Sequence, residues 1–286
     1  MKRFVTKKFF SAFKSGNLAL YLYQIMNLHF YKYEGCGNDF ILFDNRKKDI
    51  NLNTEQIKQL CDRHFGIGAD GLMLLENIEG YDFKMVYYNS DGNQSSMCGN
   101  GGRCITAFAK RLSIIKNEAH FMAVDGEHLS IMENEIISLK MNDVLKIETH
   151  SDYFSLNTGS PHVVKWVKNI EDYKVFDEGK KIRYSDPFNS KGGTNVNFIE
   201  LKNDTLFIRT YERGVENETL ACGTGVTAAA LVEAIAEKPT HANLCNVTSM
   251  GGNLNVIYTK HTDNSFTNIW LKGPACFVFE GDYIVK

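Results

Sequence analysis

The sequence lacks the features that mark several large classes of protein. Its 32 Lys and Arg residues are balanced by 34 Asp and Glu residues, so the formal charge of -2 gives no general attraction for nucleic acid or anionic lipid. No apolar run approaches the roughly 20 residues that a membrane helix needs. The 7 cysteines include no Cys-x-x-Cys pair of the zinc or thioredoxin-like kind. We therefore expect a protein of the reducing cytoplasm, with no nucleic-acid or membrane partner.

Signals for common cofactors are also missing. No P-loop or zinc-protease motif occurs, and no lysine is singled out for pyridoxal phosphate. We therefore expect the protein to use no metal and no cofactor. With 286 residues, of which 43% are apolar, the chain can still bury one or two sizeable cores.

The first 25 residues differ from the rest in composition. They carry several Lys and Arg residues and no acidic residue, and a short apolar stretch follows at residues 18–25. A secretory signal would need a cleavage site of small residues, which residues 21–25 do not supply. We expect residues 1–25 to be a flexible extension and Met26 to open the folded part of the chain.

Strand-like runs outnumber helical ones along the remaining chain. Alternating or apolar runs predict strands at residues 28–33, 40–43, 83–88, 162–167 and 205–209. Helical spacing and capping residues predict helices at residues 54–64, at about 99–112 and at about 223–237. Runs of strands with a few helices indicate an α+β fold.

A repeated pattern divides the chain. Cys98 and Cys222 each open a Cys-Gly-x-Gly segment that leads into a predicted helix. Nine positions before each cysteine, a polar residue closes a strand-like run, Asn89 in the first copy and Arg213 in the second. We therefore predict a duplicated fold with halves at residues 26–149 and 150–286.

A cysteine at the start of a helix has a distinct chemistry. The first turn of a helix has unpaired N–H groups and the positive end of the helix dipole, so it binds carboxylates and is expected to lower the pKa of a thiol from about 8.5. Two such helix starts facing one another would place Cys98 and Cys222 on opposite sides of one substrate carbon. One thiolate could then remove a proton while the other thiol returns one, which is racemisation or epimerisation.

Several further motifs occur in the same order as in a known family. They are residues 35–40, 62–71, 89–92, 97–104, 211–214, 218–225 and 273–275, with sequences GCGNDF, DRHFGIGADG, NSDG, MCGNGGRC, YERG, ETLACGTG and GPA. With these motifs the chain resembles the diaminopimelate epimerases, cofactor-independent enzymes that interconvert LL- and meso-diaminopimelate on the route to lysine and peptidoglycan. The resemblance covers residues 28–286.

The resemblance implies a fold, an assembly and a set of site residues. The fold is two pseudo-symmetric halves, each a curved, mostly antiparallel sheet wrapped around a central helix, with the last strands able to cross back to the first half, and the assembly is a homodimer. Cys98 and Cys222 would be the acid/base pair of the epimerase. The other implied substrate-binding residues are Asn38, Asn89, Gly99, Asn100, Asn195, Glu212, Arg213, Gly223 and Thr224.

One motif departs from the family pattern. Ser160 precedes Pro161 and His162 where the family usually has Asn, so one polar contact to the far end of the substrate changes from an amide to a hydroxyl. A water could replace the missing contact. His162 is either a supporting group of the site or a histidine that is hydrogen-bonded beside a turn.

Three other kinds of protein were weighed as alternatives. Proline racemases share the duplicated fold and the cysteine pair, but a substrate with one amino-acid head group has little use for Asn89, Asn195 and Arg213. Phenazine-biosynthesis-type isomerases share the fold but lack the paired cysteines. A non-catalytic thiol module, either a redox sensor or a metal binder, would use Cys98 and Cys222 differently, although no further soft ligands stand at ligand spacing.

Overall fold

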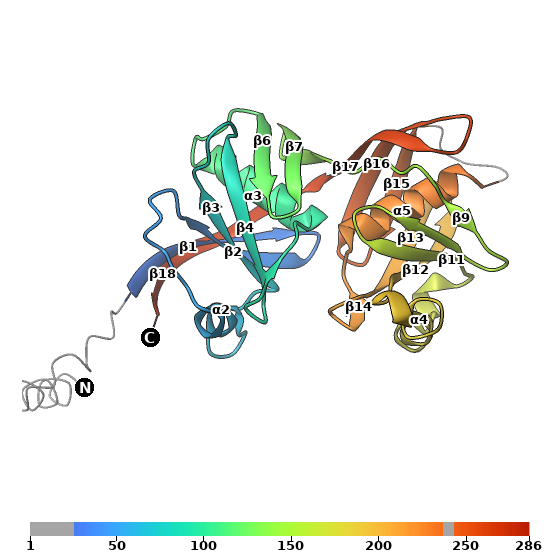
Figure 1. Ribbon diagram of the computed structural model, residues 1–286, viewed down its shortest axis with the longest axis horizontal. Coiled ribbons are helices and arrows are strands. Elements are labelled where there is room, and N and C mark those ends of the chain that lie inside the picture. The colour runs from blue at the N-terminus through green and yellow to red at the C-terminus, as the bar shows by residue number, and fades with distance from the viewer. Residues whose placement is uncertain (1–25, 237–242, 286) are drawn as a thin grey trace, which may run out of the picture.

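The computed structural model describes residues 26–236 and 243–285 of the chain (Figure 1). The extension expected at residues 1–25 lies outside the described residues. The described part contains the α-helices Thr54–Cys61 (α2), Gly99–Arg111 (α3), Val175–Arg183 (α4) and Gly223–Ala234 (α5), and the 3-10 helices Ile170–Asp172 and Asn189–Lys191. Over these residues, no helix has the length and apolar character to cross a membrane.

The strands form two series of similar layout. The first series is Met26–Gly35 (β1), Asn38–Asp44 (β2), Gly71–Glu76 (β3), Phe83–Asn89 (β4), Gln94–Ser95 (β5), Glu118–Ala123 (β6), Gly126–Glu133 (β7), Ile136–Lys140 (β8) and Glu148–Thr149 (β9). The second is Phe154–Asn157 (β10), Pro161–Trp166 (β11), Asn195–Lys202 (β12), Thr205–Glu212 (β13), Asn217–Thr219 (β14), Leu244–Ser249 (β15), Gly252–Lys260 (β16), Phe266–Pro274 (β17) and Cys276–Val285 (β18).

The two series pair in the same way, so the predicted duplication is confirmed. In the first half β2 pairs parallel with β3, β3 antiparallel with β4, β4 parallel with β6, and β6, β7 and β8 follow antiparallel. In the second half β11, β12, β13, β15, β16 and β17 repeat this order and these directions. The fold is therefore α+β with a mostly antiparallel sheet in each half.

The halves exchange strands. Strand β8 pairs with β17, and β9, which follows β8, pairs with β10 of the second half. In return β18, which follows β17, pairs with β1 along nearly its whole length, and Figure 1 shows the two strands side by side. The sequence expectation that the last strands cross back to the first half agrees with this arrangement. These exchanges fix the position of one half against the other.

Each half wraps its sheet around one central helix (Figure 1). Helix α3 contacts strands β1, β2, β3, β7 and β8, and helix α5 contacts β11, β12, β13, β15 and β16. Nearly every residue of α5 is buried, in keeping with its Ala- and Val-rich sequence, because a helix surrounded by sheet needs an apolar surface on all sides. The rigid sheets therefore hold the first turn of each central helix in place.

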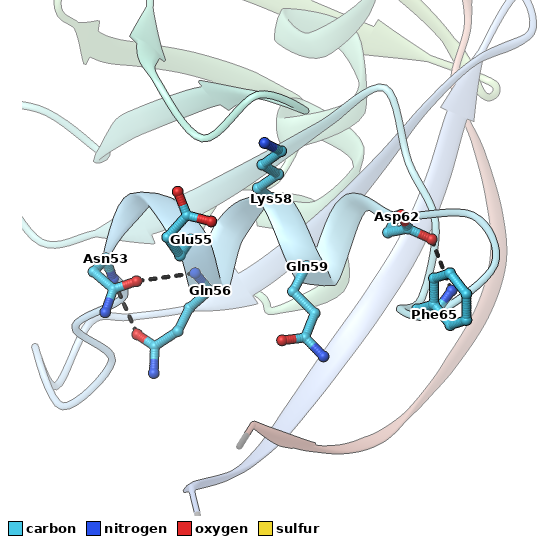
Figure 2. Close-up of a pocket in the computed structure, with 7 residues that line it drawn as sticks. All are labelled: Asn53, Glu55, Gln56, Lys58, Gln59, Asp62 and Phe65. Atoms are coloured by element: carbon cyan, nitrogen blue, oxygen red, sulfur yellow. Dashed lines mark hydrogen bonds between the residues drawn. The ribbon is translucent and has the colours of Figure 1, made fainter.

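Helix α2 lies outside the first sheet and ends earlier than predicted. Asn53 and Gln56 form a capping box at its start, with hydrogen bonds of 2.9 and 3.0 Å (Figure 2). The helix ends at Cys61, not at residue 64, because the Asp62 carboxylate accepts the N–H groups of His64 and Phe65 and turns the chain away. A surface pocket borders this helix (Figure 2), and none of the predicted site residues lines it.

Candidate active site

The structure brings the two helix starts together. A Cβ atom added to Gly99 would lie 3.3 Å from the Cα of Gly223, and one added to Gly223 would lie 3.1 Å from the Cα of Gly99. The first turns of α3 and α5 can approach this closely only because both positions are glycine. Leu271 of β17 touches both glycines and closes one side of the contact. Cys98 and Cys222 are the N-cap residues of these two helices.

Cys98 is half-buried and is held by the helix it caps. Its sulfur accepts the N–H of Gly101 at 3.2 Å, and it lies 4.0 Å from the side-chain oxygen of Asn38. Burial raises the pKa of Cys98 to about 11, and the carboxylate of Glu212 adds to the increase. The Gly101 N–H and the Arg103 charge act in the opposite direction.

Cys222 is more deeply buried, with 8% of its surface exposed. Its sulfur lies 3.5 Å from the hydroxyl of Thr224. Burial, followed by the charge of Glu212, raises the pKa of Cys222 well above that of an ordinary thiol, and Cys98 contributes in the same direction. The expectation that the helix start lowers the thiol pKa was therefore wrong for both cysteines, because burial outweighs the helix dipole.

Glu212 faces the cysteine pair from the end of β13. Its carboxylate accepts a hydrogen bond of 2.8 Å from Thr219 of the neighbouring strand β14. Burial raises the pKa of Glu212, and the nearby charge of Asp70 raises it further. Because Glu212 acts on the pKa of both Cys98 and Cys222, it lies within electrostatic reach of each sulfur.

Two asparagines connect the Cys98 side of the site with its surroundings. Asn100 is buried and donates to the Asn38 oxygen at 3.3 Å and to the backbone oxygen of Ala221 at 3.0 Å, one residue before Cys222. The Asn38 amide in turn donates to Asp70 at 2.7 Å, which fixes its oxygen towards Cys98. This chain of contacts links the first half of the molecule to the second.

A network of charged side chains holds Asn38 in position. Arg63 pairs with Asp39 and Asp70, and buried Lys32 also pairs with Asp39. Burial tends to raise the pKa of Asp39, but hydrogen bonds from Arg63 and Lys32 lower it to about 2. Arg63 and Asp70 belong to the 62–71 motif, yet sequence reasoning assigned them no role because their partners come from other segments.

A second polar cluster lies on the other side of the site. Asn195 is buried and donates to the Ser160 hydroxyl at 2.9 Å, while its oxygen accepts the backbone N–H of Arg213 at 2.9 Å. The Arg213 guanidinium lies 3.4 Å from the same hydroxyl. The structure thus groups three of the predicted residues, with Ser160 in the place of the usual asparagine.

His162 lies beneath this cluster and is completely enclosed. The amide nitrogen of Asn197 donates to Nδ1 of His162 at 3.0 Å. The oxygen of the same Asn197 side chain accepts a hydrogen bond from Thr210, which fixes the orientation of the amide. Nδ1 is therefore an acceptor and Nε2 carries the proton. Burial, with the charge of Arg213, lowers the pKa of His162 to about 3. Nε2 has no hydrogen-bond partner within the described ranges.

The last of the predicted substrate-binding residues is Asn89. Asn89 ends β4 opposite Gly71 of β3, and no hydrogen bond within residues 26–236 and 243–285 joins its side chain to either cysteine. The other cysteines are in no disulfide, and all but Cys276 are buried, which fits a packing role. The segment at residues 66–71 has the G-x-G-x-x-G spacing of a dinucleotide loop, but it precedes strand β3 and opens no helix, so it lacks the required context.

Sequence comparison adds the names of relatives. A family model described as diaminopimelate epimerase matches residues 30–143 and 154–278. The chain is 56% identical over 253 residues to a diaminopimelate epimerase from Flavobacterium psychrophilum, which covers 87% of this chain and 98% of the relative. It is 41% identical over 257 residues to one from Chlorobaculum tepidum, covering 86% of this chain and 98% of the relative.

Solved structures share the fold at much lower identity. A phenazine biosynthesis protein of the PhzF family from Bacillus anthracis superposes with a TM-score of 0.72 at 13% identity, covering 91% of this chain and 99% of that one. A hydroxyproline epimerase from Agrobacterium vitis superposes with a TM-score of 0.65 at 12% identity, covering 91% and 93%. These likenesses establish the duplicated fold and nothing about the substrate.

Proposed function

Because the chain belongs to the diaminopimelate epimerase family, we propose that it inverts the configuration at one α-carbon of diaminopimelate, with Cys98 and Cys222 as the two acid/base groups. The protein is an isomerase of the epimerase type. The observation that carries the proposal is the close approach of Gly99 and Gly223, because it puts two cysteine-capped helix starts at one point.

The reaction needs one thiolate and one thiol. The thiolate takes the α-proton, and the electrons of the C–H bond move into the substrate carboxylate to give an enediolate. The opposite thiol then donates its proton to the other face of the carbon, which leaves an inverted centre and a thiol–thiolate pair with exchanged roles. The two cysteines and the substrate account for every proton and electron pair in this scheme, so it needs no oxidant, reductant or other co-reactant.

The helix starts supply the groups that stabilise this charge. The N–H groups of Gly99, Asn100, Gly223 and Thr224 belong to first helical turns, where they have no partner within the helix. We assign these groups to the reacting carboxylate, because donors that are already oriented stabilise the developing enediolate.

The far end of the substrate is a second amino-acid head group. Arg213 can bind its carboxylate in fork geometry, and Glu212 can pair with an ammonium group. Asn38, Asn195 and Ser160 offer amide and hydroxyl groups around these charges, and Asn89 is assigned to the same end. Ser160 and Asn195 are already hydrogen-bonded to each other, so they form one prearranged contact surface.

The wider setting follows from the family. We propose that the protein acts in the cytoplasm, in the synthesis of lysine and peptidoglycan precursors, and that it forms a homodimer. Strand β18 exposes the apolar side chains of Phe277, Val278 and Phe279. Neighbouring exposed apolar side chains of this kind are suited to contact with a second copy of the chain.

Isotope exchange tests the proposed reaction. Purified protein in deuterated water should incorporate α-deuterium into LL-diaminopimelate and form the meso product, while L-proline serves as the comparison substrate. Cys98→Ala and Cys222→Ala should each abolish epimerisation, whereas Cys276→Ala, at the exposed cysteine, should retain it. Turnover by either of the first two variants would reject the two-base scheme, and exchange with proline alone would displace the substrate assignment.

A further inference from the structure

A buried arginine beneath the Cys98 helix start has no acidic partner. Arg103 is 0% exposed, and its guanidinium donates to Pro274 O at 3.2 Å, Gly99 O at 3.1 Å and Asn100 Oδ1 at 2.9 Å. It also donates to the sulfur of Cys36 at 3.7 Å. None of the ion pairs among the described residues includes Arg103, so the partners of its guanidinium hydrogen bonds are all neutral atoms.

Such a residue needs a reason to be buried. Arginine keeps its charge at every accessible pH, and a buried charge without a counterion is costly. Two other buried or half-buried cations in the described part of the chain are paired, Lys32 with Asp39 and Arg209 with Glu218. Arg103 therefore provides a positive charge that neutral carbonyl and amide groups only partly offset.

The position of this charge connects it to the site. Arg103 is on α3, one turn after Cys98, and it holds the carbonyl of Gly99 and the side chain of Asn100. Asn100 in turn contacts Asn38 and the backbone of Ala221 beside Cys222. Through Pro274, Arg103 also contacts the end of β17, the strand whose Leu271 touches both glycines.

We propose that Arg103 is a positioning residue of the epimerase reaction, which supplies a fixed positive charge for the anionic form of Cys98 and holds Asn100 across the junction of the two halves. The proposal rests on the proposed function. The charge and the positioning of Asn100 can be tested separately. Lysine keeps the charge but lacks the planar set of donors of a guanidinium, whereas glutamine keeps hydrogen-bond donors but carries no charge.

Several other groups act on the same sulfur and have to be kept constant. The titratable or charged groups that face Cys98 are Tyr87 of β4, Cys104 and Arg103 of α3, Glu212 of β13, and Cys222 at the start of α5. Of these, only Arg103 is positive, and it favours the thiolate. Removing its charge should therefore make Cys98 harder to ionise.

The first measurement is independent of turnover. The rate of iodoacetamide alkylation at Cys98, followed by mass spectrometry as a function of pH, reports the ionisation of this thiol. In Arg103→Gln we expect the midpoint to rise by about one pH unit, with a rate about tenfold lower at a fixed pH below it. In Arg103→Lys the midpoint should stay near that of the wild type. Lys110→Met, which removes a surface charge from the same helix, is the matched control.

The second measurement follows α-deuterium exchange against pH. In Arg103→Gln, the acidic limb of the pH profile of kcat/KM should move to higher pH by the same amount as the alkylation midpoint. In Arg103→Lys, kcat should fall because Asn100 is no longer held, and the acidic limb should stay in place. If Arg103→Gln does not fold, Arg103→Lys and Arg103→Met at low temperature provide the comparison. Unchanged midpoints in the neutral variants would overturn the role of Arg103. Absence of exchange by the wild type would overturn the proposed function, and the alkylation data would still test the charge.

Discussion

Replacing Gly99 by alanine tests the close approach of the helix starts most directly. The new Cβ would lie 2.9 Å from Leu271 Cδ2 and 3.3 Å from Gly223 Cα. Leu271 can yield by rotating its side chain, but Gly223 is backbone, so α3 and α5 must separate by a few tenths of an ångström. Cys98 and Cys222 would move apart with the helices that they cap.

The expected cost differs between stability and activity. Adding a methyl group to a tight contact destabilises a fold by about 1–3 kcal/mol. For catalysis, a misplacement of about 1 Å costs about 100-fold, so a shift of a few tenths of an ångström should lower kcat/KM by about three- to tenfold. We therefore expect Gly99→Ala to fold, with a loss of stability of this size and a several-fold loss of activity.

Gly102→Ala is the matched control on the same helix. Its new Cβ would also lie 2.9 Å from a leucine Cδ2, that of Leu139, and 2.9 Å from the sulfur of Met97, but it meets no backbone of the second half. Both variants should therefore lose similar stability in urea unfolding, while deuterium exchange should be impaired mainly in Gly99→Ala. Equal activity of the two variants would refute the reasoning.

Two further predictions concern the surroundings of the site. Asp70→Ala removes the carboxylate that accepts from the Asn38 amide and pairs with Arg63. A hydrogen bond to a charged group contributes about 1.5–3 kcal/mol, so the variant should unfold at a lower urea concentration, and kcat/KM should fall because Asn38 is no longer oriented. Wild-type kinetics would contradict this role of Asp70. His162 has a pKa of about 3 against an ordinary 6.5, so the unfolded chain binds a proton that the folded protein does not, and stability should decline as pH falls below 6.5. Urea unfolding at pH 7.5 and pH 5 should show a smaller decline in His162→Gln, and an equal decline would exclude His162 as the cause.

Local signals accounted for the elements that hold the site. Both cysteine helices and the strands before them follow from glycines, caps and alternation within short windows, and the matching of the two copies indicated the duplication. The division at about residue 150 stays a prediction. Helix α4 was missed because Gly179 interrupts a polar segment; the structure shows that the ring of Tyr211 occupies the space where a side chain at 179 would lie.

Long-range contacts were not predictable in the same way. The thiol pKa of Cys98 depends on burial and on the charge of Glu212, which lies on β13 of the other half. Arg103 reaches Pro274, far along the chain, and Asn100 reaches Ala221. A sequence read in short windows carries no information about such pairs, so it predicted the residue types of the site but not the charges around them.

The pairing of β18 with β1 sets the order in which the molecule can be completed during translation. Met26 lies opposite Val285, so one edge of the first strand stays without its partner until the final strand has left the ribosome. The second half already has its borrowed strand β9, which is synthesised before β10. The half that is made first is therefore finished last, and a nascent chain stalled before Cys276 would expose an unpaired strand edge to chaperones or to aggregation.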